Sequence, residues 1–336
     1  MQAAGFLTDY VGYSLFRDAG LPAPRVTFAS VSVNGKPFGL YVEVEAVTSK
    51  FLGRWFGDGA GDLYEGPGDI TRAGDLDVDS DPDLADRDAL KALAGAAEAV
   101  AGGEALDRLG QLMDLRQLAR YLVLEARANH WDGYNGPNNY RIYRDPLTEK
   151  FTLIPHGADQ LFGSASADIF QPGRGVLARA LLAGEEGREM YREAVLSILD
   201  TAWDPQRIRE RAYQAYVRIR PHVIADSRSP FALSSVEERI HRMLAHFEER
   251  RRFAAWQLAG DRDPELAARL AKVSRTSSRG FPGPGGDRFF FAGPGGPGRG
   301  PGGPGRPGEP GGPERIPLDP GGPGGAPPGP GVVPPG

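Results

Sequence analysis

The sequence predicts an α+β fold in which one helix and a small sheet precede a mainly helical region with an inserted β-hairpin. Three observations carry this prediction. Apolar residues recur at helical spacing near the start, alternating residues flank two turns, and helical periods dominate after residue 168. Strands and helices do not alternate along the chain, so a parallel βα sheet is not expected.

The first predicted elements are a helix over residues 6–19 and a hairpin of strands over 26–33 and 38–44. Apolar side chains repeat at helical spacing in the first segment. The two later segments alternate as half-buried strands do, and Asn34-Gly35 between them is the strongest short hairpin signal. A helix followed by a two-stranded antiparallel ribbon is therefore expected.

The rest of the folded region is predicted to be helical, apart from one short strand and a second hairpin. Periodicity and turn residues define these elements. The predicted helices cover 48–56, 87–101, 112–128, 187–199, 205–219 and 235–258, and the predicted strands cover 63–64, 140–143 and 151–154.

The last predicted helix begins with a capping box. Ser235 can cap the helix amides while Glu238 reaches back to the cap. Near its other end this amphipathic helix carries the basic run Arg250–Arg252, directly after two glutamates. Such a run is expected on a solvated face.

Glycine and proline mark the end of the folded region. A large share of the 47 glycines and 30 prolines lies after about residue 278, where apolar side chains are scarce. Such a segment cannot bury enough apolar surface to fold. The prediction is one folded domain over 1–273 and a disordered Gly/Pro-rich tail over 274–336.

Composition limits the classes of partner. With 39 basic and 44 acidic residues, the net charge of −5 lacks the basic surface that nucleic-acid binding needs, so no nucleic acid is expected. No cysteine is present, which excludes disulfides and thiol chemistry. The start lacks the pattern of a signal peptide, and no apolar run is long enough for a membrane span.

The residues between the helix over 112–128 and the segment after the second hairpin carry the chemistry. A carboxylate, Asp132, follows the long helix, the amide of Asn139 stands at the mouth of a strand, and Asp159 follows the far strand. Mg²⁺ prefers hard oxygen ligands, and a hairpin can hold such groups together. This is the layout of a phosphoryl-transfer site, with Asp132 as catalytic aspartate and Asp159 and Asn139 as metal ligands. Asn138 is an alternative to Asn139.

The same residues could instead have purely structural roles. Asp132 could instead cap a turn, and Asp159 could anchor a loop. No His-x-x-x-His pattern and no Cys accompanies His130 and His156, so packing or supporting roles are favoured over a metal pair.

An acidic run over 75–86 approaches the spacing of a calcium loop. Ser80 replaces the glycine of such a loop and Asp86 replaces its bidentate glutamate. A solvated loop that caps the next helix is favoured over a calcium site.

The chain resembles the CotH kinase family of atypical protein-kinase-like proteins. The matching motifs run in family order: Gly20-Leu-Pro-Ala-Pro-Arg, Val33-Asn-Gly-Lys-Pro-Phe-Gly-Leu-Tyr-Val-Glu-Val-Glu, Asp62-Leu-Tyr, Asn129-His-Trp-Asp-Gly-Tyr, Asn139-Tyr-Arg-Ile-Tyr and Ile154-Pro-His-Gly-Ala-Asp-Gln-Leu-Phe-Gly. The resemblance implies a secreted or envelope-associated enzyme that uses ATP and Mg²⁺ or Mn²⁺ to phosphorylate Ser or Thr of a protein substrate.

The resemblance also implies a division into lobes. Residues 1–64 correspond to part of an N-lobe and the hinge, and 65–273 to the C-lobe. The hinge is Glu45, Ala46 and Val47, whose backbone is expected to bind adenine.

Two departures from the family pattern bear on activity. Many members have Trp-Asp-x-Asp where this chain has His156-Gly-Ala-Asp159, so Asp159 is the remaining carboxylate. A kinase also needs a glycine-rich turn and a lysine before its C-helix, which the resemblance equates with the predicted helix over 6–19. Neither feature precedes residue 6 here. The expectation is an N-terminally truncated kinase domain. The alternative is an inactive pseudokinase or a structural spore-coat or cell-surface protein.

Overall fold

The structure is a computed structural model that describes residues 5–81, 83, 85–170, 173–260, 281–282 and 288–289. It divides into two compact units, Met1–Arg279 and Gly280–Gly336. In the second unit, β7 (Phe281–Pro282) pairs antiparallel with β8 (Arg288–Phe289). The rest of the predicted disordered tail over 274–336 lies outside the described residues.

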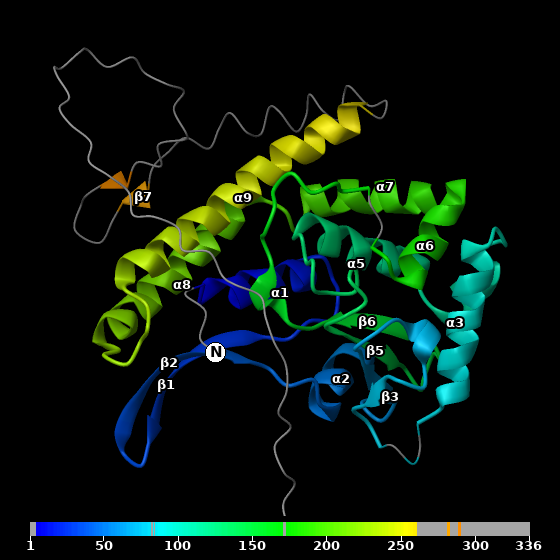
Figure 1. Cartoon of the computed structure of the whole chain (residues 1–336), viewed down its shortest axis with the longest axis horizontal. Coiled ribbons are helices and arrows are strands. Elements are labelled where there is room, and N and C mark those ends of the chain that lie inside the picture. Colours follow the sequence, from blue (N-terminus) through cyan, green and yellow to red (C-terminus); the bar gives the residue numbers. More distant parts are fainter. Residues whose placement is uncertain are drawn as a thin grey trace, which may run out of the picture. The chain divides into compact units, whose positions relative to one another are not determined.

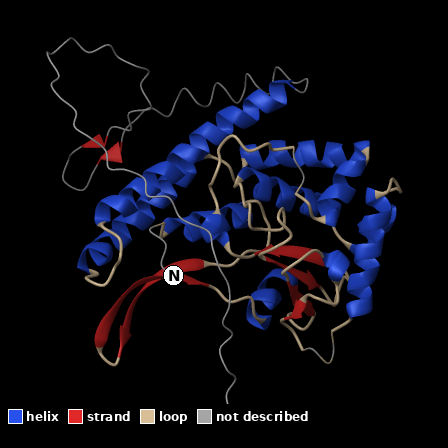
Figure 2. Ribbon diagram, in the orientation of Figure 1, coloured by secondary structure: helices blue, strands red, loops and turns tan. Residues whose placement is uncertain are grey.

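The first unit is α+β, as predicted, and Figure 2 shows most of its helices gathered on one side of two small sheets. Its helices in the described ranges are α1 (Leu7–Asp18), α2 (Ser49–Phe56), α3 (Arg87–Ala101), α4 (Asp107–Leu112), α5 (Leu115–Arg127), α6 (Val176–Ala183), α7 (Glu185–Asp200), α8 (Pro205–Ala225) and α9 (Leu233–Gly260). Its strands are β1 (Val26–Val33), β2 (Lys36–Val44), β3 (Asp62–Glu65), β4 (Asp77–Val78), β5 (Tyr140–Arg144) and β6 (Phe151–Pro155), with 3₁₀ turns η1 (Ile70–Arg72) and η2 (Ala158–Gln160).

Strands β1 and β2 form the predicted ribbon, which extends away from the helices in Figure 1. Asn34 and Gly35 both have positive φ, 51° and 75°, as a type I′ hairpin turn requires. The ribbon is attached to α8, because the Leu40 amide donates a 3.0 Å hydrogen bond to Oδ2 of Asp226.

The second sheet has the order β4-β3-β5-β6, and every pair is antiparallel. Successive residues of a strand face opposite sides. Ile142 and Leu153 therefore join the main core, whereas Tyr143 and Ile154 join a smaller cluster with Phe51 of α2. Packing on both faces holds the β5-β6 hairpin rigidly next to the segments that precede and follow it.

Two helices were not anticipated from the sequence, and one predicted cap is wrong. Helices α4 and α6 are short, and neither was predicted. The C-terminal helix begins at Leu233, so Ser235 lies inside its first turn and is not the cap. Leu233 packs against the core, which favours the earlier start over the local capping signal. The cap of α3 agrees with the sequence, since the Asp86 side chain accepts from the amides of Asp88 and Ala89.

The prediction that Arg250–Arg252 lie on a solvated face is wrong for two of the three residues. Arg250 and Arg251 are buried, and only Arg252 is exposed. Arg250 donates hydrogen bonds to the carbonyls of Ala126 and Arg127. These carbonyls belong to the last turn of α5, where backbone carbonyls have no hydrogen-bond donor within the helix. The buried arginine supplies that donor. The pattern of charges along the sequence does not reveal this role.

None of the helices in the described ranges combines the length and the apolar composition that a bilayer crossing requires.

Candidate functional site

Helix α5 leads directly into the loop that carries the predicted catalytic residue. Asp114 caps its start by accepting from two amides of the first turn. At its end the His130 amide donates to the Glu125 carbonyl, and Asn129 has a positive φ of 50°. This left-handed residue reverses the chain, and the loop folds tightly from there to the start of β5.

The structure brings Asp132 together with both candidate asparagines. Nδ2 of Asn138 donates to Oδ1 of Asp132 over 3.0 Å, and Nδ2 of Asn139 donates to Oδ2 over 2.8 Å. All three side chains are half-buried. Because each amide uses its nitrogen on Asp132, the carbonyl oxygen of each remains able to accept a cation. The two asparagines therefore stay equivalent as candidate ligands.

The β5-β6 hairpin places Asn139 against the segment before Asp159. Tyr140 pairs with Pro155, so Asn139 lies beside the chain that leaves β6. Gly157 has a φ of +62°, and a Cβ built there would stand 2.9 Å from Cγ of Asn139. Gly157 thus lets the backbone pass closely over the asparagine.

Asp159 lies in η2 and is exposed. Its carboxylate forms no hydrogen bond or ion pair with the described residues. Helix α1 packs against η2 and brings Asp9 near it. Burial and, after it, the Asp159 carboxylate raise the pKa of Asp9 to about 6. The carboxyl groups of Asp9 and Asp159 are thus close enough to repel each other.

A buried pair, Glu125 and His130, supports the loop from below. Nδ1 of His130 is 2.8 Å from Oε1 of Glu125, and its Nε2 is 3.1 Å from the Gly157 carbonyl oxygen. Burial alone would lower the pKa of His130, but the Glu125 carboxylate outweighs burial and the net pKa is raised. Through these two contacts His130 ties the loop of Asp132 to the segment that carries Asp159.

The second histidine makes separate contacts, as expected for a supporting residue. His156 contacts Arg141 at 2.8 Å and Glu65 at 3.3 Å, and Arg141 also pairs with Asp79. These contacts join β3, β5 and the acidic loop, and they hold the outer end of the hairpin in place.

The predicted adenine-binding segment lies in the link between β2 and α2. Partial burial would raise the pKa of Glu45, but hydrogen bonds from Arg54 and Arg25 outweigh it and lower the pKa to about 2. The Ala46 carbonyl accepts from the Thr48 amide. Backbone groups of Val47 have no hydrogen bond among the described residues. No hydrogen bond of the described chain joins this segment to Asp132.

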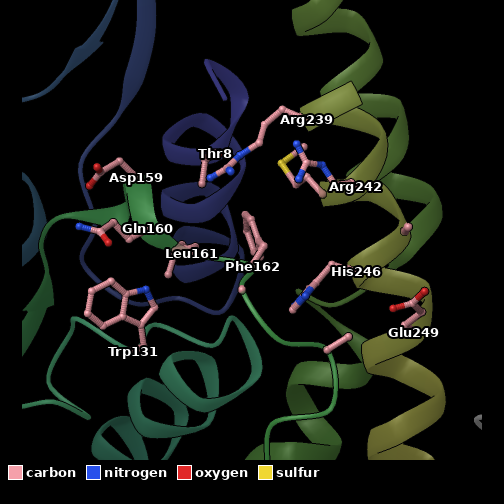
Figure 3. Close-up of a pocket in the computed structure, with 14 residues that line it drawn as sticks. Thr8, Trp131, Asp159, Gln160, Leu161, Phe162, Arg239, Arg242, His246 and Glu249 are labelled. Carbon is pink, nitrogen blue, oxygen red and sulfur yellow. The ribbon is translucent and has the colours of Figure 1, made fainter. Parts of the chain in front are cut away.

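A pocket of about 600 Å³ opens beside Asp159, between the chain after η2 and helix α9 (Figure 3). Trp131, which precedes Asp132 and is 58% exposed, forms part of its wall. The pocket is lined by Thr8, Trp131, Asp159, Gln160, Leu161, Phe162, Gly163, Ala165, Arg239, Arg242, Met243, Ala245, His246 and Glu249.

The donor groups fit a hard divalent cation rather than a zinc site. Across the described ranges, no three His, Cys, Asp or Glu side chains gather closely enough to hold a metal ion. The residues that could hold such an ion are Asp159 and one of the two asparagines, through its carbonyl oxygen. Mg²⁺ is commonly bound in this way, by one or two protein oxygens with waters and nucleotide phosphates completing its shell.

Sequence reasoning did not single out Asp9, Glu125 or Trp131. Glu125 did leave a signal, because it follows Tyr121 by one helical turn on the apolar stripe of α5. A charged residue on such a stripe is buried and needs a partner. Asp9 and Trp131 carry no comparable local signal.

A family model described as CotH kinase protein matches residues 2–254. Inner spore coat protein H of Bacillus subtilis (strain 168) is 24% identical over 253 residues, which cover 69% of this chain and 68% of that protein. The matched range includes Asp132, Asn139 and Asp159, and it ends inside α9.

Proposed function

Because the chain belongs to the CotH kinase family, we propose that it transfers the γ-phosphoryl group of ATP to Ser or Thr of a protein, with Mg²⁺ or Mn²⁺ as metal. The observation that carries the proposal is the arrangement around Asp132. Two amides hold its carboxylate, and the unpaired carboxylate of Asp159 lies beyond the Asn139–Gly157 contact. Positioning and charge stabilisation are what phosphoryl transfer requires of a protein.

In this proposal Asp132 orients the acceptor hydroxyl and takes its proton. The hydroxyl oxygen bonds to the γ-phosphorus, the bond from that phosphorus to the β,γ-bridging oxygen breaks, and ADP leaves. Hydrogen bonds from Asn138 and Asn139 fix both carboxylate oxygens of Asp132. The side chain therefore loses little conformational entropy when it binds the acceptor hydroxyl.

Asp159 and the carbonyl oxygen of Asn139, or of Asn138, would hold the metal. The chemistry that a divalent ion would supply there is neutralisation of the charge of the β- and γ-phosphates. The hydrogen bond from His130 to the Gly157 carbonyl joins the loop of Asp132 to the segment before Asp159. The backbone of Glu45–Val47 would meet adenine as the hinge between a partial N-lobe, residues 1–64, and a C-lobe, residues 65–273.

Replacing Asp132 tests this proposal. We expect Asp132→Ala to lower phosphate transfer to a protein acceptor by about 100-fold or more, the usual contribution of a positioned general base. Incorporation of labelled phosphate from ATP is measured with Mg²⁺ or Mn²⁺. Asp107→Asn, an exposed acidic residue on α4, is the matched control. Undiminished transfer by Asp132→Ala sinks the assignment.

A second candidate is a structural protein of the spore coat or cell envelope that keeps the fold for binding. The name of the related inner spore coat protein H favours it. This candidate predicts no transfer by the unaltered protein at saturating ATP and Mn²⁺. It also predicts no rise in thermal stability when nucleotide is added, because a ligand that binds the folded state raises the melting temperature.

A further inference from the structure

We propose that the pocket between η2 and α9 binds the acceptor protein, and that it selects segments with an anionic side chain near the Ser or Thr. The proposal rests on the proposed phosphoryl transfer, since it names the class of substrate for that site. The occupant is a protein segment, and its anionic group is either a carboxylate or a phosphoserine.

The position of the pocket suits an acceptor. Its wall runs from Asp159 and Trp131, the neighbour of Asp132, to α9 (Figure 3). A segment lying in it places one residue beside the proposed site while its other residues contact α9. Trp131 is 58% exposed and supplies a flat apolar surface at the inner end, and such aromatic surfaces are enriched where proteins meet.

The charge on the α9 side of the pocket fits an anion. Arg239 and Arg242 are both exposed and line the pocket, together with one acidic residue of the same helix, Glu249, so the two arginines outnumber the carboxylate on this side. In the described part of the chain Arg239 forms no ion pair, and Arg242 only approaches Glu238 at 3.8 Å, with both side chains largely exposed. An exposed ion pair contributes little free energy, so Glu238 does not prevent Arg242 from binding a ligand. Both guanidinium groups can therefore bind one. Arginine also matches carboxylate and phosphate with two parallel hydrogen bonds.

His246 is an independent sign that the pocket takes a polar ligand. It is only 4% exposed, and neither ring nitrogen makes a hydrogen bond of normal geometry among the described residues, although the backbone of Arg127 lies near the ring. In Figure 3 the ring is directed from α9 toward Phe162, whose centroid is 5.6 Å away. A buried polar group without a partner is costly. A ligand that pairs with it recovers that cost, which an apolar ligand cannot do.

Binding of labelled peptides to the full chain tests the proposal. Four short fluorescein-labelled peptides share one Ser, followed by two Glu, two phosphoserine, two Gln or two Lys residues. Fluorescence anisotropy without nucleotide measures each affinity. We expect the two anionic peptides to bind at least about tenfold more tightly than the Gln peptide, and the Lys peptide most weakly. The ratio between the Glu and phosphoserine peptides shows which anion is preferred.

Two variants assign the effect to this pocket. Arg239→Glu/Arg242→Glu should reverse the order of the four peptides, whereas Arg252→Glu, an exposed change on the same helix outside the pocket, should leave it unchanged. His246→Phe should weaken the anionic peptides several-fold. Circular dichroism checks folding, and the single change Arg242→Gln replaces the double variant if the latter is unfolded.

Equal binding of all four peptides, or an unchanged order in both arginine variants, overturns the proposal. Displacement of the Glu peptide by ATP also overturns it, because the arginines would then serve the nucleotide. The same experiments distinguish a failure of the proposed phosphoryl transfer from a failure of the pocket assignment. Asp132→Ala should bind the Glu peptide as the unaltered protein does, and selective binding without any phosphate transfer contradicts the proposed reaction while leaving the pocket assignment intact.

Discussion

Gly157 and His246 illustrate how single residues shape the two sides of the site. Gly157 has a backbone conformation that other residues rarely adopt, and it lies directly over Asn139. His246 is buried in the pocket wall, and in the described part of the chain its ring nitrogens make no hydrogen bond of normal geometry. In both cases the atoms packed directly around the residue determine how a substitution there would change stability.

Gly157→Ala should destabilise the protein and impair the proposed transfer. The positive φ and the close approach to Asn139 together cost about 2 kcal/mol. Displacing Asn139 should lower phosphate transfer by more than about tenfold. Gly95→Ala in α3 is the control, because a Cβ there meets nothing within 4 Å and alanine stabilises a helix interior by about 0.5–1 kcal/mol. Thermal unfolding that is equally unchanged in both variants contradicts this expectation.

His246 should make the protein sensitive to acid. Burial, with the Arg250 guanidinium as the next cause, lowers the pKa of His246 to about 4 from the ordinary 6.5. The unfolded chain therefore binds the proton first, and stability is lost as the pH falls through this interval. The full loss is about 3 kcal/mol. Urea unfolding should show that slope for the unaltered protein, and His246→Phe should remove it. An identical slope in the variant would falsify this attribution.

Among the elements, α5 and α9 are joined at the site by the side chain of Arg250. Helix α5 ends just before the loop of Asp132, and the carbonyls at that end accept from Arg250 of α9. Arg250 also donates to the Ala165 carbonyl, in the chain that follows η2. One side chain thereby joins the helix before the loop, the chain beyond Asp159 and the helix that lines the pocket.

Arg250→Met should destabilise the protein by about 3 kcal/mol. The change keeps most of the side-chain volume but leaves several buried carbonyls without a donor. Arg252→Met, two positions further along the same helix and exposed, should change the free energy of unfolding by less than about 0.5 kcal/mol. Urea unfolding of the three proteins measures both effects. Similar midpoints for the two variants contradict the role given to Arg250.

For the whole molecule, the core lies within one unit. The buried apolar residues of the main cluster run from Phe6 to Ala254, and the smaller cluster around α2 lies between Phe51 and Ile154. Both belong to the unit Met1–Arg279. The hydrophobic contribution to stability is proportional to the apolar area that is buried, so it should reside in this unit.

A chain ending at Arg279 should therefore be as stable as the full chain. We expect the two free energies of unfolding to agree within about 0.5 kcal/mol, as for changes outside a core. Urea unfolding followed by circular dichroism measures both. Loss of more than about 1 kcal/mol on shortening would show that residues after 279 contribute to the stability of the first unit.

Much of the fold could be predicted because its signals are local. The bounds of β1 and α3 agree with prediction, and Asn34-Gly35 adopts the expected turn. The family was also predicted, since ordered motifs survive in the sequence and the family match confirms it. Helix α6 was not predicted, because a run of eight mostly apolar residues has no polar face to reveal its period.

The sequence by itself determined where most helices and strands form, and it identified Asp132, Asn138, Asn139 and Asp159 as the candidate site. Turns, caps and periodicity depend on neighbours within a few residues, so they can be read along the chain. Only the tertiary structure decided what surrounds that site: Asp9 beside Asp159, the Glu125–His130 pair beneath the loop, and Arg250 buried at the end of α5. These contacts join residues that are near in space and, for Asp9 and Arg250, more than 100 positions apart. Packing of the whole core selects such partners. Of these residues, Glu125 leaves a local signal, its place on the apolar stripe of α5, whereas no local pattern records the positions of Asp9 and Arg250.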